Sequence, residues 1–96
     1  MAKRLSDSAR DTAFEPLKAK GWSLSEDATA IHKVWKFKDF SQAWGFMARV
    51  AMEAEKRDHH PDWSNSYNKV EITLSTHSAK GLTALDFDLA ESLESF

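Results

Sequence analysis

Three of the four histidines in this chain lie close together in the sequence, at His59, His60 and His77. Histidine exchanges protons readily near neutral pH, so a group of imidazoles can supply both a general acid and a general base. Pro61 follows the adjacent pair and restricts His60 to an extended backbone conformation. These residue types at this spacing predict a site for proton transfer.

Two other interpretations of these histidines remain open on the residues alone. The adjacent pair could belong to a solvent-exposed connection between a helix and a strand, with no chemical role. Alternatively, Glu55 and His59, four residues apart at a helix end, could bind a metal ion together with His77. The zinc-binding helix pattern His-Glu-x-x-His is missing, so we predict no metal.

Asp86 and Trp63 each have a structural and a functional interpretation. Asp86 follows Thr83 by three residues, which is the spacing of a capping box at the start of a helix. This structural role is favoured over direct catalysis. Trp63 is either a core ring or a platform for a flat heterocycle. Other catalytic templates are missing, since the chain has no glycine-rich phosphate loop, nucleophile elbow or dinucleotide fingerprint.

The composition limits the classes to which the chain can belong. With 96 residues, 42% of them hydrophobic and 29% charged, we expect a single domain over residues 1–96. The net charge of −2 disfavours a nucleic-acid-binding face, and the lack of cysteine excludes disulfides and thiolate chemistry. No segment has the length of a membrane-spanning helix and none resembles a signal peptide, so we expect a cytoplasmic protein.

Hydrophobic spacing predicts three helices. The first is expected over residues 6–20 and the second over residues 40–56, and Ser6 and Asp39 can cap them. The third begins after Thr83. The second helix carries the clearest apolar stripe, which comprises Phe40, Trp44, Met47, Ala51 and Ala54.

Alternation with a period of two predicts strands between these helices. Residues 22–37 are interpreted as a hairpin, with Lys33 among the inward-facing positions. Residues 67–76 give the best strand, with one apolar face and with Tyr67 and His77 on the other face. This order of helices and strands predicts an α+β domain whose antiparallel sheet is covered by helices on one face.

The histidine-rich stretch resembles the signature of the pterin-4a-carbinolamine dehydratases. That signature places two histidines and a proline after an acidic residue, and an aromatic residue, a further histidine and an aspartate after them. The matching residues here are Glu55, His59, His60, Pro61, Tyr67, His77 and Asp86. The string His-His-Pro-x-Trp-x-Asn-x-Tyr-Asn-Lys-Val, the string Leu-Ser-Thr-His and the pair Gly21-Trp22 extend the resemblance over nearly the whole chain.

The resemblance implies an enzyme, a 4a-hydroxytetrahydrobiopterin dehydratase. Such a hydro-lyase converts a 4a-hydroxytetrahydropterin into the quinonoid dihydropterin and water, and thereby recycles the cofactor of aromatic amino-acid hydroxylases. No electrons move in this reaction, so we expect no cofactor, because the pterin itself is the substrate. The family fold is a four-stranded antiparallel sheet with three helices packed on one face, in the order helix-strand-strand-helix-strand-strand-helix.

The same resemblance implies roles for individual residues. His59, His60 and His77 would be the catalytic, pterin-contacting set, with His60 and His77 nearest the C4a hydroxyl and His59 assisting. Glu55 and Asp86 would orient the imidazoles. The residues expected to shape the substrate pocket are Asp58, Pro61 and Trp63.

The resemblance also implies a homo-oligomer, either a dimer or a tetramer, which suits the modest core of a short chain. A function of a different class is a role as a dimerisation cofactor or transcriptional coactivator, as in some animal members of the family. A non-catalytic pterin binder is a third hypothesis, which the complete histidine set disfavours. We expect no membrane contact, and no direct contact with nucleic acid.

Overall fold

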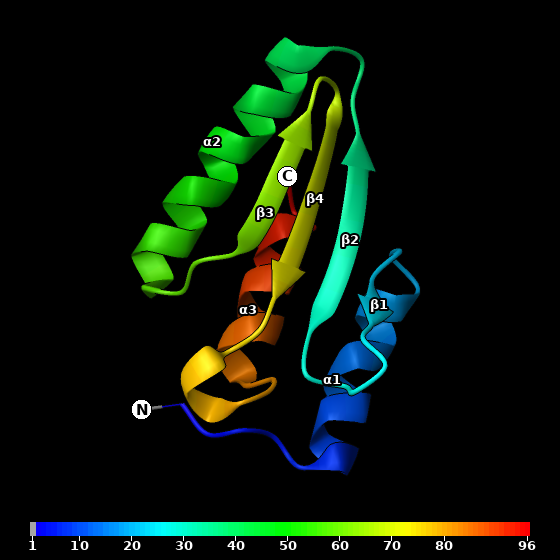
Figure 1. Cartoon of the computed structure of the whole chain (residues 1–96), viewed down its shortest axis with the longest axis vertical. Coiled ribbons are helices and arrows are strands. Elements are labelled where there is room, and N and C mark those ends of the chain that lie inside the picture. The colour runs from blue at the N-terminus through cyan, green and yellow to red at the C-terminus, as the bar shows by residue number, and fades with distance from the viewer. Residues whose placement is uncertain (1) are drawn as a thin grey trace.

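Three α-helices cover one face of a four-stranded antiparallel sheet in this chain (Figure 1). The computed structural model describes residues 2–96. Its elements are α1 (Asp7–Lys18), β1 (Ser23–Leu24), β2 (Ile31–Lys36), α2 (Phe40–Arg57), β3 (Asp62–Ser66), β4 (Lys69–Leu74), the 3₁₀ helix η1 (His77–Ala79) and α3 (Ala84–Leu93). The strand order is β1-β2-β4-β3. The predicted α+β class and the implied order of elements are confirmed.

The core lies between the sheet and the helices. On β4 the alternating residues Val70, Ile72 and Leu74 are fully buried, as the sequence pattern predicts. Leu17 of α1 and Leu89 of α3 are also fully buried and belong to the same cluster. Burying one such side chain stabilises the fold by about 1.5–3 kcal/mol, so this cluster holds the helices on the sheet.

Lys33 lies among the inward-facing positions of β2, as predicted, and the structure shows how its charge is accommodated. Its Nζ is 2.6 Å from Oε2 of Glu94, which also accepts a hydrogen bond of 2.9 Å from Nε1 of Trp22. The ammonium group also lies 4.9 Å from the ring centroid of Trp35. A half-buried cation therefore has a carboxylate partner that comes from the end of α3.

The prediction of a strand over residues 67–76 is wrong at both ends. Tyr67 lies in the two-residue turn between β3 and β4 with a φ of 52°, and His77 begins η1. Tight hairpin turns require a positive φ, and the side chain of Asn65 supports this one by donating to the backbone carbonyl of Tyr67 at 3.1 Å. Tyr67 and His77 therefore do not share a strand face.

The helix predicted over residues 40–56 is confirmed, but most of the stripe that predicted it faces away from the core. The residues of α2 that are buried against the sheet are Ala43, Phe46, Val50 and Ala54. Of the predicted stripe only Ala54 is buried, and the side chain of Trp44 is 60% exposed. α2 therefore has a second apolar flank beside its core-facing side. None of the helices in residues 2–96 is long and apolar enough to cross a membrane.

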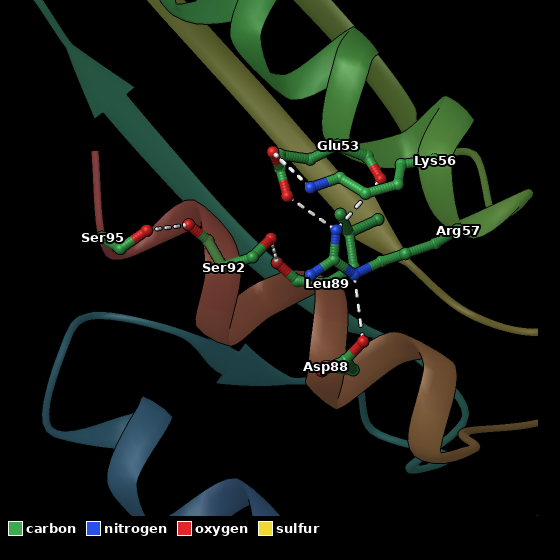
Figure 2. A network of polar contacts seen from close by, with 7 residues as sticks. All are labelled: Glu53, Lys56, Arg57, Asp88, Leu89, Ser92 and Ser95. Atoms are coloured by element: carbon green, nitrogen blue, oxygen red, sulfur yellow. Dashed lines mark hydrogen bonds and ion pairs between the residues drawn. The ribbon is translucent and has the colours of Figure 1, made fainter.

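Arg57, in the last turn of α2, joins that helix to α3 (Figure 2). Its Nε lies 3.0 Å from Oδ2 of Asp88, and its Nη1 lies 2.7 Å from Oε1 of Glu53 one turn earlier. The hydrogen bond between Arg57 and Glu53 lowers the pKa of the Glu53 carboxyl and raises the pKa of Arg57. These contacts hold the end of α2, which leads to His59, against the helix that carries Asp86.

Candidate active site

The three clustered histidines lie at one end of the sheet, where α2 ends, β3 begins and β4 is followed by η1 (Figure 1). The C-cap of α2 is Asp58, whose φ of 49° is left-handed and whose backbone N–H donates to the carbonyl of Ala54. The backbone N–H of His59 donates to the same carbonyl at 3.0 Å. This tight turn directs the chain from the helix back toward the sheet and buries His59.

His59 is held by a buried carboxylate. Its Nε2 lies 2.6 Å from Oδ1 of Asp86, and the two residues are 8% and 0% exposed. An ionised carboxylate only accepts hydrogen bonds, so Nε2 donates and the neutral ring carries its lone pair on Nδ1. Nδ1 of His59 has no hydrogen-bond partner within residues 2–96. Every buried side-chain nitrogen or oxygen in these residues has such a partner, so Nδ1 of His59 is not buried and reaches the surface.

Asp86 has two structural contacts at once. Its Oδ2 accepts the backbone N–H of Thr83 at 2.9 Å and the hydroxyl of Thr76 at 2.7 Å. The first of these bonds completes the capping box at the start of α3, so the predicted capping role is confirmed. The other oxygen faces His59, and the fold thereby links the helix cap to the buried imidazole.

His60 and His77 each face a carboxylate on the surface. Nε2 of His60 is 3.0 Å from Oε1 of Glu55, and Nε2 of His77 is 3.2 Å from Oδ2 of Asp62. All four side chains are exposed, so these pairs orient the rings only loosely. The structure thus places Glu55 beside His60 and Asp86 beside His59.

Asp62 is the residue of this site that the sequence analysis missed. It follows directly after the proline of the His-His-Pro string, which was the available signal. Its partner His77 lies fifteen residues further along the chain, and only the pairing of β3 with β4 brings the two together. The contact of Asp62 with His77 therefore joins the start of β3 to the start of η1.

The other residues expected to shape a pocket occupy different surroundings. Asp58 is the exposed C-cap of α2, and Pro61 is half-buried just before β3. Trp63 lies on β3 and lines an apolar hollow of about 400 Å³ beside α2. A second, more polar hollow of about 240 Å³ adjoins His77 and is lined by Thr29, Ser75, Thr76, His77, Lys80 and Gly81. The structure therefore separates Trp63 from the hollow beside His77.

Each of the three histidines contacts a different carboxylate. Within residues 2–96, no group of three or more His, Asp or Glu side chains lies in a metal-binding arrangement. One buried imidazole with a fixed tautomer and two exposed imidazoles can together accept, donate and exchange protons. The fold and the site thus define a small α+β protein with a histidine–carboxylate site suited to acid–base chemistry.

Comparison with known proteins agrees with this class. The family model for pterin 4 alpha carbinolamine dehydratase matches residues 3–96. Two similar proteins, both provisionally named pterin-4-alpha-carbinolamine dehydratase, come from Novosphingobium aromaticivorans and Rhodospirillum rubrum. The first is 56% identical over 93 residues, covering 97% of this chain and 95% of that protein. The second is 53% identical over 96 residues, covering 98% and 96%.

A solved structure is similar over the same length. The crystal structure described as a transcriptional coactivator/pterin dehydratase from Brucella melitensis has a TM-score of 0.87 and 47% identity, with 97% of both chains covered. The chain belongs to the pterin-4a-carbinolamine dehydratase family, and the resemblance seen in the sequence is confirmed.

Proposed function

We propose that this chain is an enzyme that removes water from a 4a-hydroxytetrahydropterin and releases the quinonoid dihydropterin. The observation that carries the proposal is the placement of three histidine–carboxylate pairs at one end of the sheet, with His59 held by the buried Asp86 and with His60 and His77 exposed, in a chain of this family. The names of the similar proteins support the same reaction. In this role the enzyme would return the pterin formed by an aromatic amino-acid hydroxylase to its recycling pathway.

The reaction needs one proton donor and one proton acceptor. The C4a–O bond breaks, and the leaving hydroxide takes a proton from a general acid to become water. The N5–H proton passes to a general base while the C4a–N5 double bond forms. Atoms and charge balance with no electron transfer, so imidazole groups are chemically sufficient.

His60 and His77 are the groups we assign as acid and base, with His59 assisting. Both exposed rings can exchange protons with solvent between turnovers, and their partners Glu55 and Asp62 favour particular ring orientations. His59 differs because its Nε2 is occupied by Asp86, so only Nδ1 is available to a bound pterin.

The pterin ring would lie against the polar hollow beside His77. The hollow is small for a whole ligand, so the substrate would extend from it over the neighbouring histidines. The Asp58 carboxylate is exposed next to His59 and can accept hydrogen bonds from the amino group of a pterin. Pro61 would fix the backbone beside the ring, whereas Trp63 lines the separate apolar hollow beside α2 and would not contact the pterin.

We also propose that the chain forms a homo-oligomer, through the exposed apolar flank of α2. Trp44 and Met52 are 60% and 64% exposed, and Trp63 on the edge strand β3 lies beside them. Contiguous apolar surface of this kind marks protein interfaces. The same flank gives a second candidate function, a coactivator role through protein contacts, which the description of the Brucella melitensis structure favours.

Steady-state kinetics with a freshly generated 4a-hydroxytetrahydropterin tests the proposed function. We expect the wild-type chain to accelerate loss of the substrate absorbance. His60→Ala and His77→Ala should each lower kcat by about 10²–10⁴-fold, the usual contribution of a general acid or base. Both residues are exposed, so circular dichroism should show folded variants. A wild-type rate equal to that in buffer would contradict the proposal and favour the coactivator role.

A further inference from the structure

Thr76 contacts two parts of the candidate site. It directly precedes His77, and its side chain is buried. Its backbone N–H donates to the carbonyl of Gly81 at 2.9 Å, which closes the loop that carries η1. Its hydroxyl lies 2.7 Å from Oδ2 of Asp86 and 2.8 Å from the hydroxyl of Thr83. One residue therefore contacts both the loop of His77 and the carboxylate that holds His59.

The donors and acceptors of this cluster can be assigned in only one direction. A hydroxyl has a single proton, and a carboxylate can only accept, so Thr76 donates to Asp86. The hydroxyl of Thr83 must then donate to Thr76. Asp86 thus accepts hydrogen bonds from the hydroxyl of Thr76, from the backbone N–H of Thr83 and from Nε2 of His59. Aligned hydrogen bonds of this kind strengthen one another in a buried setting.

The helix cap does not require the hydroxyl of Thr76. The capping box of α3 consists of the Thr83 side chain and the bond from the Thr83 backbone N–H to Asp86, and both are complete without Thr76. The hydroxyl of Thr76 is the second donor to Oδ2 of Asp86. Its hydrogen bond therefore fixes the rotation of the carboxylate. The other oxygen is then directed at Nε2 of His59.

We propose that Thr76 is a positioning residue for the dehydration reaction. Its hydroxyl fixes the carboxylate of Asp86, which keeps His59 in the Nε2–H tautomer with Nδ1 toward the substrate. Its backbone places His77 on the neighbouring turn. The inference rests on the proposed function for its kinetic consequence, while the tautomer of His59 is a property of the free protein.

The test compares Thr76→Val, which keeps the shape of threonine and removes the hydroxyl, with Thr76→Ser, which keeps the hydroxyl. Long-range ¹⁵N–¹H correlation spectra of the imidazoles report the tautomer of His59, and kinetics report kcat and KM. We expect a single Nε2–H tautomer in the wild type and in Thr76→Ser, and mixed tautomers in Thr76→Val. Thr76→Val should lower kcat by about tenfold or more with little change in KM, as for other partners that orient a functional histidine.

Two results would overturn the proposal. One is an Nδ1–H tautomer of His59 in the wild-type protein, a measurement that needs no variant and so does not depend on Thr76→Val folding. The other is a Thr76→Val protein with an unchanged tautomer, which would limit Thr76 to packing. If the wild type shows no dehydratase activity, the proposed function fails, and the tautomer comparison still decides the positioning role of Thr76.

Discussion

Replacing Asp86 by asparagine removes the charge of the buried carboxylate and keeps its shape. Asp86 accepts hydrogen bonds from Nε2 of His59, from the hydroxyl of Thr76 and from the backbone N–H of Thr83. With the amide oxygen at the position of Oδ2, both threonine bonds remain, and what is lost is the hydrogen bond that His59 donates to a charged carboxylate. We expect Asp86→Asn to lower the free energy of unfolding by about 1.5–3 kcal/mol, the value of one hydrogen bond to a charged group.

Alanine at the same position gives the contrasting case. Asp86→Ala leaves three buried donors without an acceptor, at about 1–3 kcal/mol each, so the total loss is about 3–9 kcal/mol. Domains of this size are stable by only about 5–15 kcal/mol, so a large part of the fold's stability disappears. Urea unfolding followed by tryptophan fluorescence should show Asp86→Asn folded and less stable, and Asp86→Ala far less stable than Asp86→Asn.

Asp86→Asn should lower the activity as well as the stability, because it changes the tautomer of His59. The new amide group presents N–H to Nε2 of His59, which can accept only if the ring takes the Nδ1–H tautomer. Nδ1 then no longer has a lone pair for the substrate. We expect kcat to fall by about 10–100-fold, the range for loss of a partner that orients a functional histidine, in a protein that circular dichroism shows to be folded.

Asp88→Asn is the matched control, because it makes the same chemical change on α3 at an exposed carboxylate that contacts Arg57. We expect it to change the free energy of unfolding by less than about 1 kcal/mol and to leave kcat unchanged. Full activity in Asp86→Asn, or equal losses of kcat in the two variants, would refute the role that we assign to the contact between Asp86 and His59.

Three other changes give distinct expectations. Because Arg57 lowers the pKa of Glu53 below its ordinary 4.5 in the folded chain, their pair stabilises the fold above that pH, and this stabilisation is lost as the pH falls through the lowered value. Glu53→Gln should therefore lower the Tm at neutral pH and leave it unchanged in strong acid; an equal loss at both would contradict this. Trp44→Ser should reduce the molar mass measured by light scattering while the circular dichroism spectrum is retained, and an unchanged mass would exclude the α2 flank as the interface. Asp62→Asn should cost less than about 1 kcal/mol of stability and lower kcat by about fivefold or less through His77, so a fold that fails to form would contradict a surface role.

Local patterns predicted the elements that bury one regular face, and they failed where burial depends on distant partners. The alternation at Val70, Ile72 and Leu74 gave β4 correctly because each of these side chains faces the helices. On α2 the same reasoning favoured the stripe of Trp44, since periodicity shows that a flank is apolar and not whether the sheet covers it. β3 was not visible as an alternation because its residues are mostly polar and exposed.

The candidate site was predictable in its residue types and not in its contacts. The capping role of Asp86 is local and could be read from its spacing to Thr83. Its contact with His59 spans 27 positions and depends on how α3 packs beside the end of α2. The pairing of His77 with Asp62 depends in the same way on the register of β3 against β4. Short-range spacing contains no information on either pair.

The most direct test of the central claim is whether a pterin binds at the end of the sheet that carries these histidines. Protein with ¹⁵N-labelled histidines would be titrated with a stable dihydropterin while the imidazole resonances are recorded. We predict that the resonances of His59, His60 and His77 shift together with one binding curve. His32 on β2, to which we assign no contact with the substrate, is the internal reference and should shift least. Saturable binding, measured by calorimetry, that leaves the three clustered histidines unshifted would contradict the account.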